Sequence, residues 1–393
     1  MRVVRWLLAL VALTFFFKGT PSDASAQSWP QDKWPVSSLE REGIDPAAID
    51  SLVVDMQTGK YGHIDHFLLI RHGRVVADHH FERDYAKVAA QYSPKNHQYD
   101  YDHPTWHPYY RDSKLHTLQS VTKSIMSAAL GIAIDEGRIP NGIKAPAMPF
   151  FKPYRLDLSD PRKRSMTIAD MLTMRGGLRW NEMVSYESAE NSCIQLEASD
   201  DWIQFVLDQP MREPPGTVFN YNSGVSVLLG KIVRVATGQR IDSYVQEKLF
   251  GPIGIKKAHW KITPKGEVDT EGGLYLTAHD LARIAYLFLR NGNWNGKQIV
   301  SREWVRASTS PVIPDIRPAN GRPDAGYGYQ WWVPHHENGK TRIFSGRGLG
   351  GQFPVVVPDY DLVAVFNAWN IHGRTEMSSE SAVWERILPA IRK

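Results

Sequence analysis

Short apolar runs rich in β-branched and aromatic residues, bounded by turn residues, lie near both ends of the chain. Residues 67–71 and 74–77 flank His72-Gly73, which predicts two short strands joined by a tight turn. Similar runs near the other end cover 329–333, 341–344, 353–357 and 362–366. Both ends of the chain are therefore predicted to form strands.

The middle of the chain has helical spacing instead. From Ser120 onward, Ile125, Ala128 and Ile132 lie on one apolar stripe, and Gly137 supplies a stop. Further helical patterns cover 167–174, 201–207, 224–236, 278–290 and 381–388, the last ended by Pro389. This order predicts an α/β (α+β) fold in one domain over 27–393: an antiparallel sheet lobe from 27–118 and 320–393, and a helical lobe inserted at 119–319.

The first residues have the pattern of a targeting segment. Arg2 and Arg5 precede the apolar run 6–17, and a polar stretch of small residues ends at Ala26. This order predicts a secretory signal peptide over 1–26 and a periplasmic or secreted mature protein. The apolar run is shorter than the ~20 residues of a membrane-spanning helix, so no stable membrane insertion is expected once it is removed.

Charge and cysteine content narrow the partners. The formal net charge is +4 in 393 residues, and the cations are scattered among Asp and Glu. A nucleic-acid partner is therefore not expected, and a small-molecule substrate is. Cys193 is the only cysteine, so no disulfide can form within the chain. The sequence does not indicate an oligomeric state.

Candidate chemistry begins with Ser120 and Lys123. A serine hydroxyl is a poor nucleophile until a base takes its proton, and positions i and i+3 share one helix face. Burial would lower the pKa of Lys123 and allow it to act as a base near neutral pH. The pair also occurs by chance, and a serine at a helix start is often only a cap.

Two later segments add to this pair. Tyr221 lies on a loop just ahead of a helix, where its phenol can point at a serine or simply pack as an aromatic side chain. The glycine-rich run 344–352 lets a backbone come close to a ligand, and one of its N–H groups can join that of Ser120 in an oxyanion hole. A hairpin turn is the simpler interpretation of the same glycines.

These three elements, in this order, resemble the β-lactamase-related serine hydrolases, which include class C β-lactamases, D-alanyl-D-alanine carboxypeptidases, esterases and 6-aminohexanoate-dimer hydrolases. The resemblance runs from about Phe67 to Val365. It includes four further landmarks: 167–178 (TIADMLTMRGGL), 250–255 (FGPIGI), 271–282 (EGGLYLTAHDLA) and 326–332 (GYGYQWW).

The resemblance implies a β-lactamase/transpeptidase-like fold and acyl transfer through a serine-bound intermediate. It implies that Ser120 is the nucleophile and that Lys123 and Tyr221 share proton transfer, with the base left open between them. Substrate contacts are expected from Ser223, Ser345, Gly346, Arg347 and Gly348. No metal and no organic cofactor is implied; His103 and His107 are poor metal candidates, because Pro104 opposes a helix that would align them.

Two motifs depart from the family pattern. The usual Y-x-N reads Tyr221-Asn222-Ser223, and the third motif, usually K-T-G or H-x-G, begins at Ser345 or at Arg347 depending on the alignment. The usual cation is thus absent or altered, which disfavours recognition of a β-lactam carboxylate. The sequence therefore favours an exported amide or ester hydrolase similar to the 6-aminohexanoate-dimer hydrolases. The alternatives are a class C-type β-lactamase or penicillin-binding peptidase, and a non-catalytic binding protein on this scaffold.

Overall fold

The computed structural model describes residues 29–90, 107–186, 188–316, 325–336, 340–371 and 375–392. The predicted signal peptide at 1–26 and His103 lie outside these residues, so the prediction of export stays a prediction.

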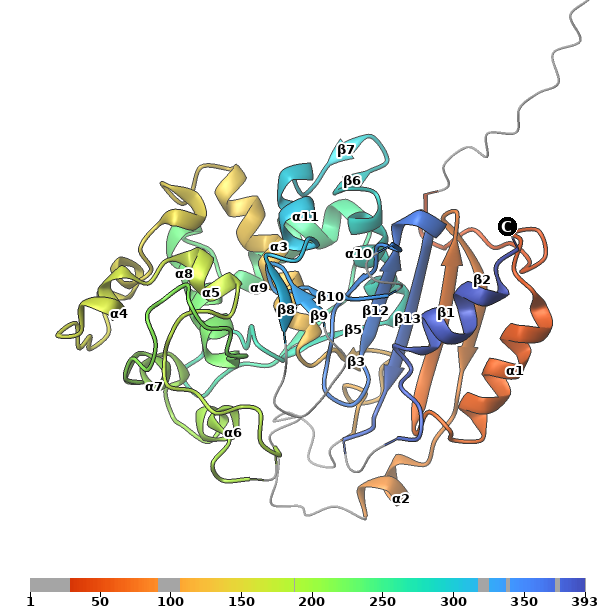
Figure 1. The fold of residues 1–393 in the computed structure, drawn as a ribbon, viewed down its shortest axis with the longest axis horizontal. Coiled ribbons are helices and arrows are strands. Elements are labelled where there is room, and N and C mark those ends of the chain that lie inside the picture. The colour runs from red at the N-terminus through yellow and green to blue at the C-terminus, as the bar shows by residue number, and fades with distance from the viewer. Residues whose placement is uncertain are drawn as a thin grey trace, which may run out of the picture.

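An eight-stranded antiparallel sheet in the order β2-β1-β13-β12-β11-β10-β9-β8 forms one side of the molecule (Figure 1). Its strands are β1 (Ile64–Arg71), β2 (Arg74–His80), β8 (Ile313–Ile316), β9 (Ala325–Tyr327), β10 (Trp332–Pro334), β11 (Phe344–Ser345), β12 (Phe353–Val357) and β13 (Leu362–Ala368). Two small sheets consist of β3 (His116–Thr117), β5 (Leu274–Leu276) and β4 (His259–Trp260), and of β6 (Asn293–Trp294) and β7 (Lys297–Gln298). The predicted antiparallel sheet, built from both ends of the chain, is confirmed.

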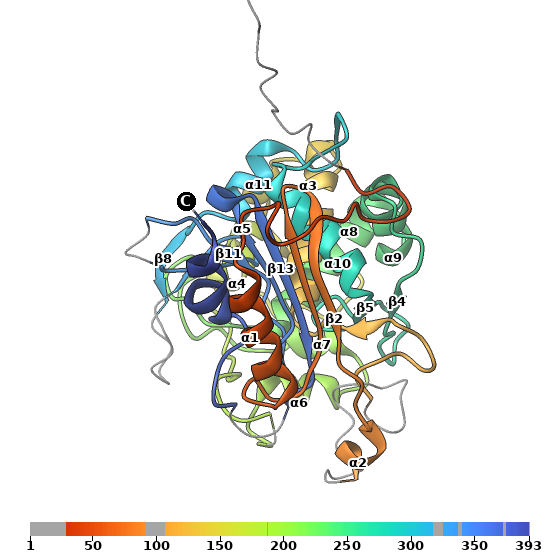
Figure 2. The same ribbon diagram turned by 90° about the vertical axis from the view of Figure 1, so that its right-hand side faces the viewer.

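Most helices lie between β2 and β8 in the sequence and form the lobe on the other side of the molecule (Figure 1). The helices are α1 (Pro46–Gln57), α2 (Tyr85–Ala89), α3 (Val121–Asp135), α4 (Pro161–Ser165), α5 (Ile168–Leu172), α6 (Ser192–Glu197), α7 (Trp202–Leu207), α8 (Ser223–Thr237), α9 (Ile241–Val245), α10 (Ala278–Leu289) and α11 (Arg302–Ser308). Helix α1 lies across the outer face of the sheet, beside the C-terminal turns (Figure 2).

Alternation along β1 explains how the sheet buries both faces. Side chains point to opposite faces at successive positions of a strand. Phe67 and Leu69 accordingly pack in the core under α1, whereas Leu68 and Ile70 pack in the larger core on the α10 side. A sheet covered on both faces gives the neighbouring helical lobe a rigid base.

The β1–β2 hairpin has the turn that its sequence predicts. His72 and Gly73 both have positive φ, at 50° and 74°, as the two central residues of a tight two-residue hairpin turn require. Helix α3 also begins where the pattern predicts. Thirteen of its fifteen residues are buried, so it runs through the core and carries its N-terminal turn to the sheet.

Three element predictions are wrong. Of the predicted strand 341–344, only Phe344 belongs to a strand, β11. The run 329–333 does not form one strand, because Gln330 takes a left-handed φ of 62° and β10 begins only at Trp332. At the C-terminus, a π-helical turn at Val383–Ile387 passes into a 3₁₀ turn at Leu388–Ala390. Pro389 lies in the first turn of this second element, where its missing N–H costs nothing, so it continues the chain instead of ending a helix.

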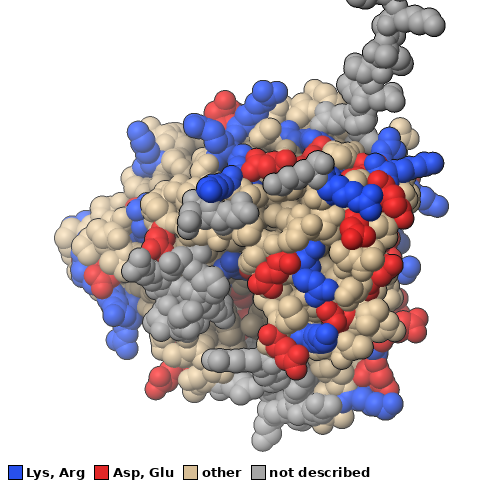
Figure 3. Space-filling model, turned by 45° about the vertical axis from the view of Figure 1, so that its right-hand side comes forward, with Lys and Arg blue, Asp and Glu red and all other residues tan. Residues whose placement is uncertain are grey.

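Positive and negative side chains are interspersed on the face drawn in Figure 3, and neither sign forms a continuous stripe there. In the described part of the chain, no helix combines the length and the apolar character needed to cross a bilayer.

Candidate active site

Ser120 lies between strand β3 of the three-stranded sheet and helix α3. Strand β3 ends at Thr117, and Gln119 then takes a φ of +48°, which is uncommon for a residue with a side chain. This left-handed residue turns the chain so that Ser120 becomes the N-cap of α3, half-buried, with its side chain making no capping hydrogen bond. The hydroxyl is therefore available to other partners, and backbone strain of this kind is common at functional sites.

Lys123 lies directly beside that hydroxyl, as the spacing predicts. Its Nζ donates to Ser120 Oγ at 2.8 Å, to the backbone oxygen of Glu271 at 2.7 Å and to a carboxylate oxygen of Glu271 at 2.9 Å. An ammonium group has three donors and no acceptor, so all of its hydrogen-bonding capacity is used. Because Lys123 is only 1% exposed, this arrangement is held by the protein rather than by solvent.

The expectation that burial makes Lys123 a base near neutral pH is not met. Burial does lower the pKa of Lys123, but interactions with Tyr221 and with the carboxylates of Glu271 and Glu182 outweigh it and raise the pKa above its usual value. The lysine is therefore a charged donor to Ser120, and it has no free lone pair with which to accept the serine proton.

Tyr221 supplies the remaining polar group at Ser120. It precedes α8, whose N-cap Asn222 accepts a hydrogen bond from Val225 N–H and so fixes the loop. Ser120 and Lys123 are both neighbours that act on the phenol, and Lys123 Nζ lies 5.4 Å from the ring centroid. Burial raises the pKa of Tyr221, while Lys123 and Ser120 act in the opposite direction. The net shift is upward, so the phenol carries its proton at neutral pH.

A group of buried acids behind Lys123 was missed at the sequence level. Burial and the nearby Glu271 carboxylate raise the pKa of Asp269 to about 6, and burial raises that of Glu197 well above its usual value. The pKa of Glu271 is lowered: burial opposes ionisation, but the charge and hydrogen bond of Lys123 prevail. Glu271 is thus the ionised partner of Lys123. Its only sequence signal was its position at the start of the landmark 271–282.

The glycine-rich run passes along the N-terminal turn of α3. A Cβ on Gly346 would lie 3.0 Å from a methyl group of Val121, and one on Gly348 would lie 2.4 Å from the backbone oxygen of Leu118. Only a chain without side chains at these two positions can approach so closely. The backbone between them, at Arg347, consequently lies beside Ser120.

The backbone N–H of Arg347 has the direction that an oxyanion hole needs. Gly346 N–H donates to Pro354 and Gly348 N–H donates to Gln352, so both point toward β12. Because alternate residues of an antiparallel ladder bond to opposite sides, the N–H of Arg347 points away from β12. It can act together with the N–H of Ser120 at the start of α3.

The side chains of the third motif point elsewhere. Ser345 and Arg347 both donate to Glu380, with Arg347 Nε 2.9 Å from the carboxylate. The Arg347 guanidinium also lies 4.6 Å from the ring centroid of Trp332, which in turn packs 5.8 Å from Tyr221. Arg347 therefore lies near the candidate site, with its charge already paired.

Ser223 is fully buried and donates its hydroxyl to Glu182 at 2.6 Å. Its substrate contact, like those expected of Ser345, Gly346, Arg347 and Gly348, stays a prediction. His107, weighed earlier as a metal ligand, accepts a hydrogen bond from Tyr109 N–H and packs edge-on against Tyr85. The structure thus brings Ser120, Lys123 and Tyr221 together.

A serine that opens a buried helix beside a lysine and a tyrosine, next to a sheet made by both chain ends, supplies the residue types that a serine-hydrolase site would need. The β-lactamase family model matches residues 65–379, and the chain belongs to this family. Members of the family are typically serine hydrolases.

Among curated proteins, the chain is similar to 6-aminohexanoate-dimer hydrolase of Paenarthrobacter ureafaciens, with 27% identity over 65% of this chain and 66% of the relative's length. Among solved structures it is similar to a candidate 6-aminohexanoate-dimer hydrolase from Bacillus anthracis, with 20% identity, TM-score 0.67, and 93% and 89% of the two chains covered. A family VIII carboxylesterase gives 15% identity and TM-score 0.63, with 91% and 98% covered. The structural likenesses establish the expected fold, and the sequence match indicates a distant relation to 6-aminohexanoate-dimer hydrolase.

Proposed function

We propose that this protein is an exported serine hydrolase that cleaves amide or ester bonds of a small substrate through an acyl intermediate on Ser120. The observation that carries the proposal is the hydrogen bond of 2.8 Å from Lys123 Nζ to the Ser120 hydroxyl, with the phenol of Tyr221 beside this pair. A lysine and a phenol so placed can activate a serine and keep it oriented.

The protonation states favour Tyr221 as the group that moves protons. Lys123 has all three donors committed, whereas a neutral phenol can accept one proton while giving up its own. Ser120 Oγ bonds to the substrate carbonyl carbon as its proton passes to the phenol oxygen, and the phenol gives its own proton to the leaving group in the same step, so that Tyr221 stays neutral. The tetrahedral intermediate then releases the protonated leaving group.

Deacylation follows the same route in reverse. Water bonds to the acyl carbon, its proton passes through Tyr221 to Ser120 Oγ, and the carboxylic acid leaves. In both steps the negative oxygen is held by the N–H groups of Ser120 and Arg347, and the Lys123 ammonium favours negative charge on the serine and phenol oxygens. No metal or organic cofactor takes part in these steps.

The pairing of Arg347 with Glu380 supports an uncharged acyl group as the preferred substrate. A free cation beside the nucleophile would attract a substrate carboxylate, as recognition of a β-lactam requires. Here Glu380 lies 2.9 Å from Arg347 and neutralises it. The relatives named 6-aminohexanoate-dimer hydrolase and carboxylesterase are consistent with amide and ester substrates.

The test compares the mature protein with Ser120→Ala, using a p-nitrophenyl ester, a short linear amide and a fluorophosphonate probe. Ser127→Ala is the matched control, because Ser127 lies on the same helix and its buried hydroxyl has no partner among the described residues. We expect turnover and labelling in the parent and in the control, and neither in Ser120→Ala. Equal labelling of all three proteins would refute the assignment of Ser120.

Two further measurements address the remaining parts of the proposal. Hydrolysis of a chromogenic cephalosporin at a rate comparable with the ester would favour a β-lactamase or penicillin-binding enzyme instead. The mass of the protein recovered outside the cytoplasm should correspond to a chain that lacks residues 1–26, and an intact N-terminus there would contradict the predicted cleavage.

A further inference from the structure

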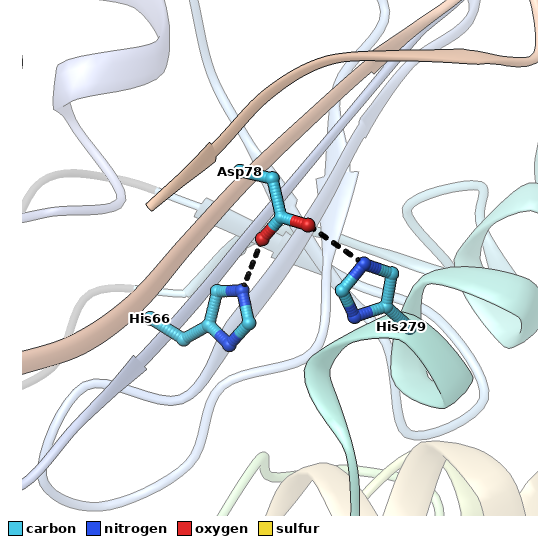
Figure 4. A group of neighbouring side chains, drawn as sticks. All are labelled: His66, Asp78 and His279. Atoms are coloured by element: carbon cyan, nitrogen blue, oxygen red, sulfur yellow. Dashed lines mark hydrogen bonds and ion pairs between the residues drawn. The ribbon is translucent and has the colours of Figure 1, made fainter. Parts of the chain in front are cut away.

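A cluster of two imidazoles and one carboxylate lies at the surface, apart from the groups bonded to Ser120. It joins three elements: His66 from β1, Asp78 from β2 and His279 from the first turn of α10 (Figure 4). His66 Nε2 lies 2.7 Å from one carboxylate oxygen of Asp78, and His279 Nε2 lies 2.9 Å from the other.

The fold fixes this convergence. In the β1–β2 register, Leu68 is opposite Asp78 and His80 is opposite His66, so these positions share one face of the hairpin. Helix α10 packs against β1 and β13 on that face, and its N-cap Thr277 holds the first turn. The ligand atoms of His66, Asp78 and His279 consequently lie within 4.8 Å of one another.

We propose that His66, Asp78 and His279 bind one zinc-like divalent transition-metal ion. Imidazole nitrogen and carboxylate oxygen are donors that zinc prefers, and three protein ligands with one position left to water form a common zinc geometry. The cluster is only partly buried, so an ion and a water molecule can reach it.

The distances require only a small adjustment. Ligand atoms of a tetrahedral zinc site, each about 2.1 Å from the ion, lie about 3.4 Å from one another. The two Nε2 atoms face different oxygens of Asp78 at 2.7 and 2.9 Å, so these two pairs must open by less than 1 Å. All ligand atoms lie within 4.8 Å of one another, so the widest pair must close by at most about 1.4 Å. Figure 4 shows the two rings directed at the two different oxygens of the Asp78 carboxylate.

His80 provides a neighbouring imidazole. The ring centroid of His80 lies 5.7 Å from that of His66. For comparison, the ring centroids of His66 and His279 are 5.6 Å apart. His80 is exposed, so it can turn toward an ion without disturbing the core. A bound ion would tie the edge of the large sheet to α10. That helix begins shortly after Glu271, the partner of Lys123, so the ion would stabilise this part of the fold.

The simplest alternative is a hydrogen-bonded network in which Asp78 accepts from two protonated Nε2 atoms and no ion binds. The test therefore measures metal binding directly. Untagged mature protein, stripped with EDTA and dialysed, is titrated with zinc in a calorimeter and with cobalt(II) in a spectrophotometer. We expect one ion per chain, a tetrahedral cobalt spectrum, and a rise in Tm of about 3–4 °C at a hundredfold excess over Kd.

The variants are His66→Ala, Asp78→Asn and His279→Ala. Each should weaken zinc binding by at least tenfold and remove the cobalt spectrum. His72→Ala is the matched control, because His72 also pairs with a carboxylate, Glu42, at 2.6 Å but has no second imidazole in that pair. It should bind zinc like the parent.

Absence of stoichiometric binding by the parent, whose fold is checked by circular dichroism, would overturn the proposal. Equal binding by the parent and the three ligand variants would also overturn it, since the ion would then bind elsewhere. Should one variant fail to fold, the parent and His72→Ala still decide whether a tetrahedral ion binds, and the remaining variants decide where.

Discussion

The ion pair between Lys123 and Glu271 gives the most discriminating prediction about the site. Replacing Glu271 with Gln keeps a polar side chain of similar size but removes the charge that lies 2.9 Å from Lys123 Nζ. Burial lowers the pKa of Lys123, and the Glu271 carboxylate is one of the groups that offset this effect. The variant removes that offset. The pKa of Lys123 should therefore fall in Glu271→Gln.

The size of the fall can be bounded. Two unit charges at 2.9 Å interact by about 6 kcal/mol at an effective dielectric constant of about 20, which is an upper limit because the amide dipole replaces part of the interaction. Opposite charges at such distances typically shift a pKa by about 1–3 units, or about 1.4–4 kcal/mol. If charged Lys123 is required for activity, the alkaline limb of the kcat/KM profile should move to lower pH by about that many units.

The assay is the pH dependence of ester hydrolysis by the parent and by Glu271→Gln, with Glu197→Gln as the matched control. Burial raises the pKa of Glu197 well above its usual value and so favours its uncharged form, which an amide resembles; this variant should therefore stay close to the parent profile. Superimposable profiles for the parent and Glu271→Gln would refute the reasoning that Glu271 keeps Lys123 charged.

The same pair predicts the acid dependence of stability. The folded-state pKa of Glu271 is lowered from 4.5, so its ionised form stabilises the fold above that value, and this contribution is lost as the pH falls through the folded-state pKa. The Tm of the parent should therefore decrease more steeply than that of Glu271→Gln below about pH 4.5. Parallel Tm curves measured by calorimetry would contradict this.

Three further variants test the groups around the nucleophile. Tyr221→Phe should lower kcat by about 10²- to 10⁴-fold with little change in KM, measured by single-turnover acylation, because it removes the proton relay. Glu380→Gln should lower KM for a carboxylate-bearing ester by about tenfold while a neutral ester is unaffected, since Arg347 loses its partner; this corresponds to about 1.4 kcal/mol. Gly348→Ala should lower kcat by about 10²-fold in steady-state assays, because its methyl group would lie 2.4 Å from the backbone oxygen of Leu118 and force the oxyanion segment away. An active Tyr221→Phe, an unchanged KM in Glu380→Gln, or a fully active Gly348→Ala would each remove the corresponding role.

The sequence predicted secondary structure correctly where interactions between neighbouring residues alone decide the backbone conformation. His72-Gly73 determines a tight turn because both residues adopt positive φ. The apolar stripe after Ser120 determines a helix, and i, i+3 spacing then brings Lys123 to 2.8 Å from Ser120 without any long-range information. Ser120 and Lys123, for which we propose catalytic roles, were therefore visible in the sequence.

The partners that set the charge state of these groups were not visible. Glu271 is 148 residues from Lys123 along the chain, and their contact depends on β5 lying between β3 and β4. The sequence left open whether Lys123 or Tyr221 is the base, and desolvation alone would have lowered the pKa of Lys123. In the structure, interactions with Tyr221, Glu271 and Glu182 outweigh desolvation and raise that pKa.

The sequence by itself determined the strands of the β1–β2 hairpin, the helix that carries Ser120, and the spacing of the serine and lysine. Each follows from interactions between residues a few positions apart. The tertiary structure alone decided that Glu271 charges Lys123, that Glu380 neutralises Arg347, and that Asp78 meets His279 from 201 residues away. Electrostatic interactions depend on distance and burial in the folded molecule, and separation along the chain fixes neither for residues on different elements.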